Sequence, residues 1–252
     1  MKSSIFCVFI RSLFLECVWN YERMQNVGFA FSIIPFLKRL YKDKEKLAKK
    51  VKLHFGFFNT HPYFASIILG ITMKMEEKYL KGEVSQDEVI RNKTMLAGPV
   101  AAIGDRLIWS SWRVFCSVLV CSYFLLHGKN FYNELNILPG LIGFLLIYNL
   151  IGHIPIRIVG LYLGYHYSYQ IIEKIAKFGP QKVVKLIRSL GIIILLIVSF
   201  VYSLSLLDIK RDVILFWFNI FLSMLLSRKI NWSLVVVFLF LVNFLFYWLV
   251  IK

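Results

Sequence analysis

Acidic residues are scarce in this sequence, and almost none stands where a proton-driven membrane carrier would need one. The 252 residues include 14 aspartates and glutamates against 30 lysines and arginines, which gives a formal net charge of +16. A proton-driven carrier generally has a titratable group within the membrane. Only Asp105 or a histidine remains for that role, so the sequence argues against this class. Beyond Asp105 every carboxylate lies at the edge of an apolar run: Glu134, Glu173, Asp208 and Asp212.

Motifs for nucleotide, cofactor and metal binding are also missing. The sequence has no phosphate-binding loop and no glycine fingerprint of a dinucleotide site. Its four cysteines lack disulfide or metal spacing, and its five histidines lack close metal-ligand spacing. We therefore expect no cofactor, no metal ion and no catalytic residue. A membrane enzyme would need a cluster of histidine, cysteine or aspartate, and the sequence shows none that is convincing.

Apolar residues make up 58% of the chain, and its mean hydropathy is +0.67. A soluble domain is about half apolar, so the composition predicts a membrane protein. In that setting, cytoplasmic loops and contact with lipid headgroups explain the excess of basic residues. A nucleic-acid-binding protein would instead need a basic patch on a folded soluble surface, and the long apolar runs argue against it.

Long runs with one charged residue or none follow Asp105, and a helix that crosses the hydrocarbon core needs about 20 apolar residues. The run at 213–227 is shorter and is compatible with a tilted or re-entrant segment. We therefore expect an all-α integral membrane protein. In it, amphipathic or re-entrant helices over residues 1–105 precede transmembrane helices over residues 106–252. The runs that predict the spanning helices cover residues 107–126, 135–156, 189–207, 213–227 and 230–251.

Basic residues predict the orientation of these helices, because lysine and arginine are enriched on the cytoplasmic side. The connection at 208–212 has no net charge, and the chain then returns to Arg228 and Lys229 before it crosses again. This pattern places the C-terminus outside the cytoplasm. The basic residues that mark the cytoplasmic side before the run at 189–207 are Lys174, Lys177, Lys182, Lys185 and Arg188.

The N-terminal part is amphipathic rather than spanning. Apolar residues from Leu37 to Phe55 fall near one face of a single predicted helix, and lysines crowd the rest of its surface. Such a helix lies against a membrane surface, or it carries a solvated basic face in a soluble setting. Further along, Ser85 and Glu88 have the spacing of a capping box and predict the start of a helix.

Three clusters of polar residues and glycines stand among apolar residues, at 19–29, 58–62 and 98–105. Amide and carboxylate groups in such surroundings need hydrogen-bonding partners, because burying them alone is costly. The partners could be each other, a second subunit or a polyhydroxylated ligand. This combination points to a membrane protein that handles a polar small molecule.

The first cluster is dense in hydrogen-bonding side chains, namely those of Asn20, Glu22, Arg23 and Gln25. Glu22 and Arg23 are sequence neighbours and would face different ways on a helix. We therefore expect each to find its partner elsewhere in the fold or in a second subunit. The flanking apolar residues favour burial of this cluster, and exposure to solvent is the alternative.

The second cluster contains Asn59, Thr60, His61 and Pro62. Pro62 biases His61 away from the helical conformation, so a turn or the start of a helix belongs here. Asparagine and threonine are good N-caps. Asn59 therefore either caps a helix or donates and accepts hydrogen bonds with a ligand or another subunit.

The third cluster runs from Gly98 and Pro99 to Gly104 and Asp105. Its small residues allow close approach of the backbone and a broken or re-entrant helix. Asp105 either accepts hydrogen bonds from ligand hydroxyls, or pairs with Arg106, or caps the next helix.

These motifs, in this order, resemble those of the IID membrane component of the mannose/fructose/sorbose family of the bacterial phosphoenolpyruvate-dependent sugar phosphotransferase system. The resemblance covers roughly residues 11–190, and several motifs in the same order are far more specific than any one alone. The matching segments are Arg11-Ser12, Asn20 to Phe29, Pro35, Leu40-Tyr41, Phe58 to Pro62, Ile68 to Gly70, Met75 to Glu77, Gly98 to Asp105, Asn149, Arg157 and Gly164-Tyr165.

The resemblance implies a multi-pass permease subunit in a bacterial plasma membrane. It would pair with a IIC membrane subunit to translocate a hexose or amino sugar, while IIA and IIB components phosphorylate the sugar. The subunit itself would be non-catalytic. On this hypothesis Asn20, Gln25, Asn59 and Asp105 line or support the sugar path. Residues with a partner-binding or structural role would be Glu22, Arg23, Thr60, Pro62, Gly98, Pro99 and Gly104.

The chain departs from the family pattern at a few positions. Ala102 replaces a common glycine and stiffens its segment, and Arg106 replaces a small residue and could neutralise Asp105. The segment at about 205–228 looks shorter than usual. The alternative function is therefore a degenerate or receptor-like membrane protein of the same family without transport activity.

Overall fold

The computed structural model describes residues 2–126 and 134–205. The chain divides into two compact units, Met1–Leu195 and Leu196–Lys252. In the second unit the described residues, 196–205, form the end of one helix. The predicted spans at 213–227 and 230–251 lie outside the described residues.

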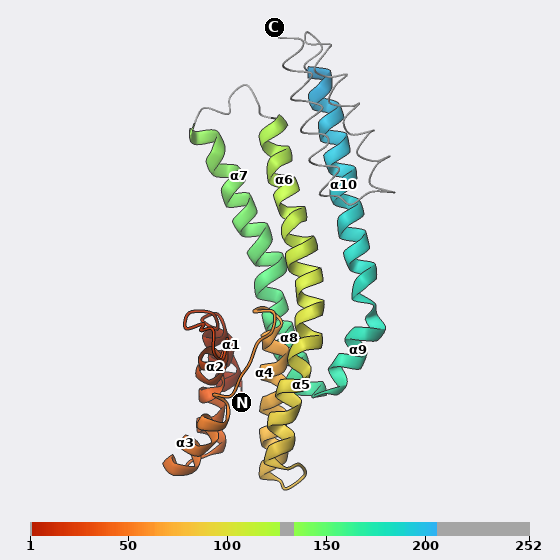
Figure 1. Ribbon diagram of the computed structural model, residues 1–252. Coiled ribbons are helices and arrows are strands. Elements are labelled where there is room, and N and C mark those ends of the chain that lie inside the picture. Colours follow the sequence, from red (N-terminus) through yellow and green to blue (C-terminus); the bar gives the residue numbers. More distant parts are fainter. Residues whose placement is uncertain (1, 127–133, 206–252) are drawn as a thin grey trace. The chain divides into compact units, whose positions relative to one another are not determined.

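In its described part the first unit is built from helices, joined by turns and by two isolated bridges between Asn20 and Met24 and between Met24 and Phe58. Two segments, η1 and η3, have the wider hydrogen-bonding pattern of a π-helix. The elements follow one another as α1 (Lys2–Ser12), α2 (Asn26–Leu40), α3 (Lys44–Leu53), α4 (Ala65–Leu80), α5 (Gln86–Gly104), η1 (Asp105–Trp112), α6 (Arg113–Leu126), α7 (Glu134–Leu146), η3 (Ile147–His153), α8 (Ile154–Tyr167), α9 (Gln170–Phe178) and α10 (Pro180–Ser205) (Figure 1).

Two continuous helices in the described part of the chain are long and apolar enough to cross a membrane. One runs over Gln86–Leu126 through α5, η1 and α6, and the other over Ile137–Tyr167 through α7, η3 and α8. In their most apolar windows only 22% and 11% of the residues are buried inside the protein. Their apolar side chains therefore face outward, as in contact with lipid. The predicted all-α membrane fold is confirmed.

The core of the first unit forms around α4, which packs against α8, α5 and α2. Phe29, Ile33 and Phe36 of α2 and Ile68 and Leu69 of α4 are completely buried. Burial of each such side chain contributes about 1.5–3 kcal/mol. This core fixes the positions of the connections that precede α2 and α4, and those connections carry the first two polar clusters.

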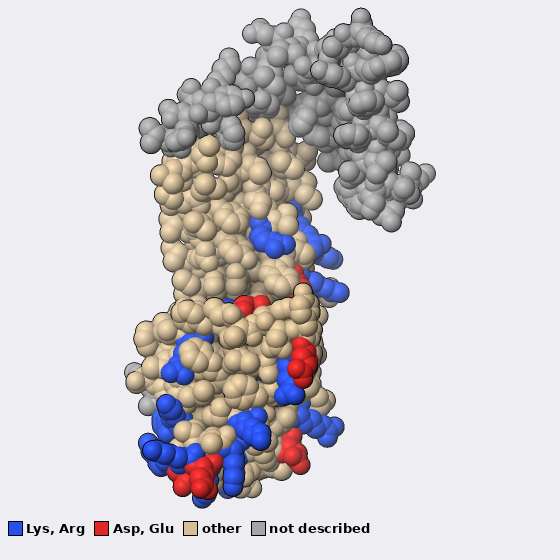
Figure 2. Space-filling model, turned by 60° about the vertical axis from the view of Figure 1, so that its left-hand side comes forward, with Lys and Arg blue, Asp and Glu red and all other residues tan. Residues whose placement is uncertain are grey.

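Charged side chains are unevenly distributed over the surface (Figure 2). In this view most of them gather at the lower end, at the level of α3 and of the turn between α4 and α5; a few lie higher on one side, and the tan surface above these shows none. An uncharged band beside a charged end is the pattern expected of a protein that is partly embedded in lipid.

The helix that we predicted from Leu37 to Phe55 is two helices, α2 and α3. The break follows from Asp43, whose Oδ1 accepts a hydrogen bond of 2.7 Å from the backbone N–H of Lys46 and caps α3. The predicted capping residue of α5 is confirmed, because Ser85 Oγ accepts from the N–H of Glu88 at 3.1 Å. Asp43 was the signal in the sequence for the break between α2 and α3. We missed it because the apolar residues keep a helical spacing on both sides of the break.

Asp43→Ala removes this cap and should lower the free energy of unfolding by about 1 kcal/mol. The measurement is denaturant unfolding of the purified protein in detergent, followed by circular dichroism. Glu45→Ala is the matched control, since it removes the same charge from the same helical turn, and no side-chain hydrogen bond of Glu45 is found among the described residues. An equal loss in the two variants would contradict a capping role for Asp43.

Candidate functional site

The first two polar clusters meet through Gln25, which lies at the start of α2 and is 3% exposed. Its Nε2 donates to the carbonyl oxygen of Thr60 at 2.7 Å, and its Oε1 accepts from the backbone N–H of Thr60 at 3.0 Å. Nε2 also donates to Glu16 Oε1 at 2.5 Å. The Gln25 amide therefore clamps the backbone of the second cluster, and its hydrogen-bonding groups are all engaged.

The third cluster joins the same site through Thr60 and His61. Thr60 Oγ1 donates to the carbonyl oxygen of Ala97 in α5 at 2.9 Å. A Cβ atom placed on Gly104 would lie 2.4 Å from the Cβ of His61, so only glycine allows this approach. The three clusters, far apart in sequence, are thus brought together in the fold.

Asn20 shapes the turn that leads into Gln25. Its Oδ1 accepts from the N–H of Arg23 at 2.8 Å, and its Nδ2 donates to Asn26 Oδ1 at 3.1 Å. Met24 in the same turn has φ 57°, the left-handed region that non-glycine residues rarely adopt. Backbone strain of this kind persists where the surroundings hold it in place, here through the bridges to Asn20 and Phe58.

The expectation for Glu22 and Arg23 was wrong. The two side chains pair with each other, with Arg23 Nε 3.1 Å from Glu22 Oε1, and they are 54% and 79% exposed for Arg23 and Glu22, respectively. Our argument assumed a helix, on which neighbouring residues diverge. The residues lie in a turn instead, where adjacent side chains can meet.

Asn59 and Asp105 are both exposed at the edges of this site. Asn59 precedes the clamped Thr60, and Asp105 follows Gly104 at the start of η1. In the described part of the chain, no side-chain hydrogen bond is found for Asn59 and no ion pair for Asp105. The expected pairing of Asp105 with Arg106 is therefore not seen, and both side chains are open to a ligand or a partner.

Gly98 and Pro99 lie inside α5, and the helix is not interrupted there. Space is open around Gly98, and the irregularity predicted for this stretch comes directly after it, in the π-helical η1. Pro62 belongs to the turn before α4, as its effect on the preceding residue predicted.

His61 is 1% exposed and lies among aromatic rings. The ring centroids of Tyr63, Phe64 and Trp109 are 5.1, 5.7 and 4.9 Å from that of His61. Burial, with smaller contributions from the neighbouring Arg157 and His153, lowers the pKa of His61 to about 4. His61 is therefore neutral at pH 7 and contributes shape and polarity to the site rather than charge.

A row of polar residues along η3 and α8 completes the surroundings of His61. Asn149 and Arg157 of this row match the family pattern, but we assigned no role to them from the sequence. His153 Nδ1 lies 3.0 Å from Asn149 Oδ1, and Arg157 Nε donates to His153 Nε2 at 2.7 Å. Arg157, 2% exposed, also donates to the carbonyl oxygen of Ser12. Tyr63 stacks on His153 at 3.9 Å. The spacing of four residues from Asn149 to His153 to Arg157 was the available signal.

A second buried polar cluster lies between α3 and α4, around Glu76, which is completely buried. Its Oε2 accepts from Tyr41 Oη at 2.6 Å and lies 3.7 Å from Lys50 Nζ, and its Oε1 lies 3.4 Å from His54 Nε2. Nearby, Lys93 is 2% exposed, and its Nζ donates to the carbonyl oxygen of His54 at 2.9 Å. This cluster holds α3 and α4 together rather than facing a ligand.

The chemistry of the site is that of hydrogen bonding to a polar solute. Its open groups are an amide at Asn59 and a carboxylate at Asp105, and Trp109 adds a ring that is 41% exposed. Amides and carboxylates bind hydroxyl groups, and aromatic rings cover the apolar faces of such solutes.

Known proteins of one family are similar to this chain over most of its length. The family model described as PTS system mannose/fructose/sorbose family IID component matches residues 1–210. The mannose-specific EIID component of Escherichia coli (strain K12) is 32% identical over 196 residues, which cover 77% of this chain and 66% of that protein. The fructose permease IID component of Bacillus subtilis (strain 168) is 31% identical over 195 residues, or 77% and 67%. The chain thus spans just under two thirds of the mannose-specific relative.

Two solved structures are also similar to this chain over nearly its whole length. One described as the structure of a membrane protein has a TM-score of 0.68 at 26% identity, with 98% of this chain and 96% of that chain covered. A chain in the cryo-EM structure of the mannose transporter ManYZ and microcin E492 (MceA) complex has a TM-score of 0.58 at 27% identity, with the same coverage.

Proposed function

The chain belongs to the mannose/fructose/sorbose family of IID components of the phosphotransferase system, and we propose that it is the membrane permease subunit of such a system. It pairs with a IIC membrane subunit and helps to translocate a hexose or amino sugar. IIA and IIB components phosphorylate that sugar. This chain supplies the path and leaves the phosphoryl transfer to them.

One observation carries the proposal: the three polar clusters come together although 68 residues of sequence, 30–97, lie between the first and the last. Gln25 binds Thr60, Thr60 binds Ala97, and Gly104 contacts His61. A buried polar junction of this kind, with open groups at its edge, is what a subunit needs to present hydrogen-bonding groups to a polyhydroxylated solute.

We assign roles to these residues according to whether their side chains already form hydrogen bonds within the fold. Asn59 and Asp105 are open, so they contact sugar hydroxyls or the IIC subunit. Asn20 and Gln25 use their amides within the fold, so they support the path by holding the turn and the second cluster. Thr60, Pro62 and the glycines fix the backbone that carries them.

The protein is a multi-pass protein of a bacterial plasma membrane, with its C-terminus outside the cytoplasm. Residues 1–105 dock on the IIC subunit, and residues 106–252 supply the spanning helices. Residue 105 falls within the continuous helix Gln86–Leu126, so that helix links the docking part to the spanning part. The lysines and the arginine that precede the uncharged run at 189–207 support this orientation.

Asn59→Ala tests the proposed contact with sugar. Loss of a hydrogen bond to a sugar hydroxyl should cost about 1–3 kcal/mol. The sugar concentration that gives half-maximal uptake should therefore rise by about tenfold. The measurement is uptake of labelled mannose, fructose and glucosamine by cells that lack their own IID component and express this chain with its IIC subunit. Asn92→Ala, which changes a half-buried asparagine on α5 whose side chain donates to the carbonyl oxygen of Glu88 in its own helix, is the control. Uptake kinetics equal to wild type would remove Asn59 from the path.

Deletion of the chain tests the function as a whole. Cells without it should lose uptake of the sugar, and the purified chain should carry the IIC subunit with it. Uptake that persists, together with a chain that purifies alone in mild detergent, would contradict the proposal.

A further inference from the structure

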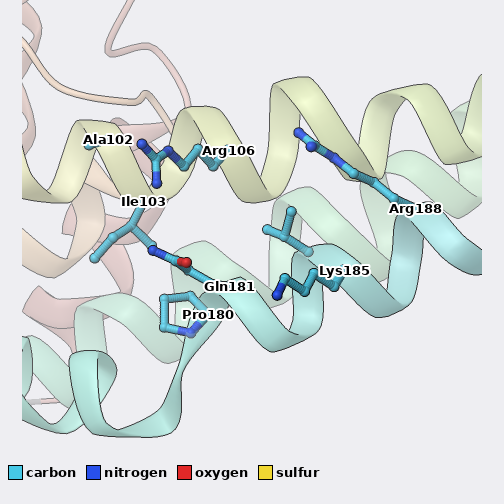
Figure 3. Close-up of a pocket in the computed structure, with 8 residues that line it drawn as sticks. Ala102, Ile103, Arg106, Pro180, Gln181, Lys185 and Arg188 are labelled. Carbon is cyan, nitrogen blue, oxygen red and sulfur yellow. The ribbon is translucent and has the colours of Figure 1, made fainter. Parts of the chain in front are cut away.

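A basic pocket lies between the continuous α5–η1 helix and the start of α10. The cavity has a volume of about 410 Å³, and its lining includes Arg106 from η1 and Lys185 and Arg188 from α10 (Figure 3). No aspartate or glutamate is among the residues that line it. The other lining side chains, such as Ile103 and Val184, are apolar or uncharged. The pocket therefore presents three positive charges to whatever enters it.

These charges are not neutralised within the described part of the protein, where no carboxylate lies within ion-pair distance of Arg106, Lys185 or Arg188. Arg188 is nevertheless held in place. Its Nε donates to Ser111 Oγ at 3.2 Å, and its Nη2 donates to Ser110 Oγ at 3.1 Å. A fixed guanidinium with free N–H groups is well suited to bind a phosphate.

An apolar groove continues from this pocket along the same two helices. It has a volume of about 300 Å³, and Arg188, Ser110 and Ser111 line it at one end. Val114, Phe115 and Ile192 are among the apolar residues along the rest of it. The basic pocket and the apolar groove thus share Arg188 and together form one amphipathic site.

The position of the site corresponds to a membrane interface. Residues 114–126 of α6 and 189–205 of α10 carry no charge, so both helices enter an apolar environment beyond Arg113 and Arg188. Trp109 in η1, which lies between Arg106 and Arg113 in the sequence, is 41% exposed. Tryptophan is enriched where headgroups meet the hydrocarbon. The basic pocket therefore lies at headgroup depth, and the groove lies on the hydrocarbon side of it.

We propose that this site binds an anionic phospholipid. The phosphate lies among Arg106, Lys185 and Arg188, and one acyl chain follows the groove past Phe115 and Ile192 toward Leu195. Basic pockets between membrane helices are suited to anionic headgroups. A free phosphate would satisfy the charges but would leave the groove empty, which favours the lipid. The site rests on the membrane setting alone and does not depend on which solute the protein transports.

The test is lipid binding by the full chain purified with its IIC subunit, measured by native mass spectrometry during titration with dioleoylphosphatidylglycerol or dioleoylphosphatidylcholine. We expect tighter binding of the anionic lipid, dioleoylphosphatidylglycerol. The double variant R106Q/K185Q leaves the bonds of Arg188 intact and should bind it about 25-fold more weakly, at roughly fivefold for each charge. The control is K46Q/K49Q, which removes the same charge from the exposed surface of α3 and should bind as wild type does.

Two further arms separate the lipid from other occupants. Gly191→Leu fills the groove next to Phe115, which lies 3.5 Å from a Cβ at that position, and it should weaken lipid binding with all three charges kept. A photo-crosslinking amino acid in place of Ile192 should attach to lipid in intact membranes. Crosslinks to the IIC subunit instead, equal binding of the two lipids, or full competition by inorganic phosphate would each overturn the proposal.

Discussion

Gly164→Ala should destabilise the protein by about 3 kcal/mol, although it adds a single methyl group. A Cβ at Gly164 would lie 2.2 Å from the carbonyl oxygen of Ile67, and one at Gly70 would lie 2.3 Å from the carbonyl oxygen of Leu161. Here α8 and α4 touch backbone to backbone. Because the clashing atoms belong to the main chain, no side-chain rotation relieves the contact, and the two helices must move apart.

The consequence is large because α4 and α8 form the most extensive helix contact in the described part of the protein. Small residues four apart on one helix, here Gly160 and Gly164, let membrane helices approach closely. Separation of α4 from α8 would also pull Tyr165 Oη away from Glu77 Oε1, to which it donates at 2.7 Å. Gly164→Leu should therefore prevent stable folding.

The measurement is denaturant unfolding in detergent, with expression level and monodispersity as a second readout. Gly143→Ala is the matched control, since Gly143 is a helical glycine of the other end of the same long helix and nothing lies within 4 Å of its added Cβ. That control should be neutral or slightly stabilising, by up to about 1 kcal/mol. Equal effects at the two positions would contradict close packing at Gly164.

The sequence predicted the fold class and the polar clusters because those depend on local pattern. The runs at 107–126 and 135–156 fall in the two described helices that are long and apolar enough to cross a membrane. The capping box at Ser85 is a signal within four residues. The clusters around Gln25, Asn59 and Gly104 stood out because amides and glycines were placed among apolar residues. What the sequence left open was the choice of partner, and for Gln25 the partner is the backbone of Thr60.

Other polar contacts of the fold join residues that are distant in sequence or depend on the path of the backbone, which no local pattern contains. Glu76 was noted within a motif, yet nothing in its neighbourhood indicates that Lys50 and His54 face it from another helix. The pairing of Glu22 with Arg23 was missed for the opposite reason, because a helix was assumed where the chain makes a turn. In both cases the tertiary path of the backbone decides which charges meet.

Glu76→Gln should lower the free energy of unfolding by about 3 kcal/mol, the usual size of the effect when one partner of a buried ion pair is removed. The carboxylate faces Lys50 at 3.7 Å, and the side chain of Lys50 is only 10% exposed. Without Glu76 the ammonium group keeps the ring of Tyr79, 3.3 Å from its centroid, but loses its counter-charge. Glu83→Gln, which changes an exposed carboxylate near Lys81, is the control and should change the free energy by less than about 0.5 kcal/mol.

The stability that Glu76 contributes should depend on pH in a definite direction. Burial alone would raise the pKa of Glu76, but hydrogen bonds from His54 and Tyr41 and the charges of His54 and Lys50 outweigh burial and hold the pKa below its usual value of 4.5. The unfolded chain therefore binds more protons than the folded protein as the pH falls through that range. The stability from Glu76 should be fully present above about pH 4.5 and lost at lower pH, so the difference between wild type and Glu76→Gln should shrink there.

A second substitution separates an unpaired charge from a packing defect. Lys50→Met in the Glu76→Gln background removes the orphaned ammonium and keeps a side chain of similar length, so it should restore more than half of the lost stability. If the double variant were as unstable as Glu76→Gln alone, the loss would come from the hydrogen bond with Tyr41 or from the shape of the cavity, and Lys50 would not be the partner that makes Glu76 necessary. The two unfolding curves therefore identify which contact of Glu76 holds α3 against α4.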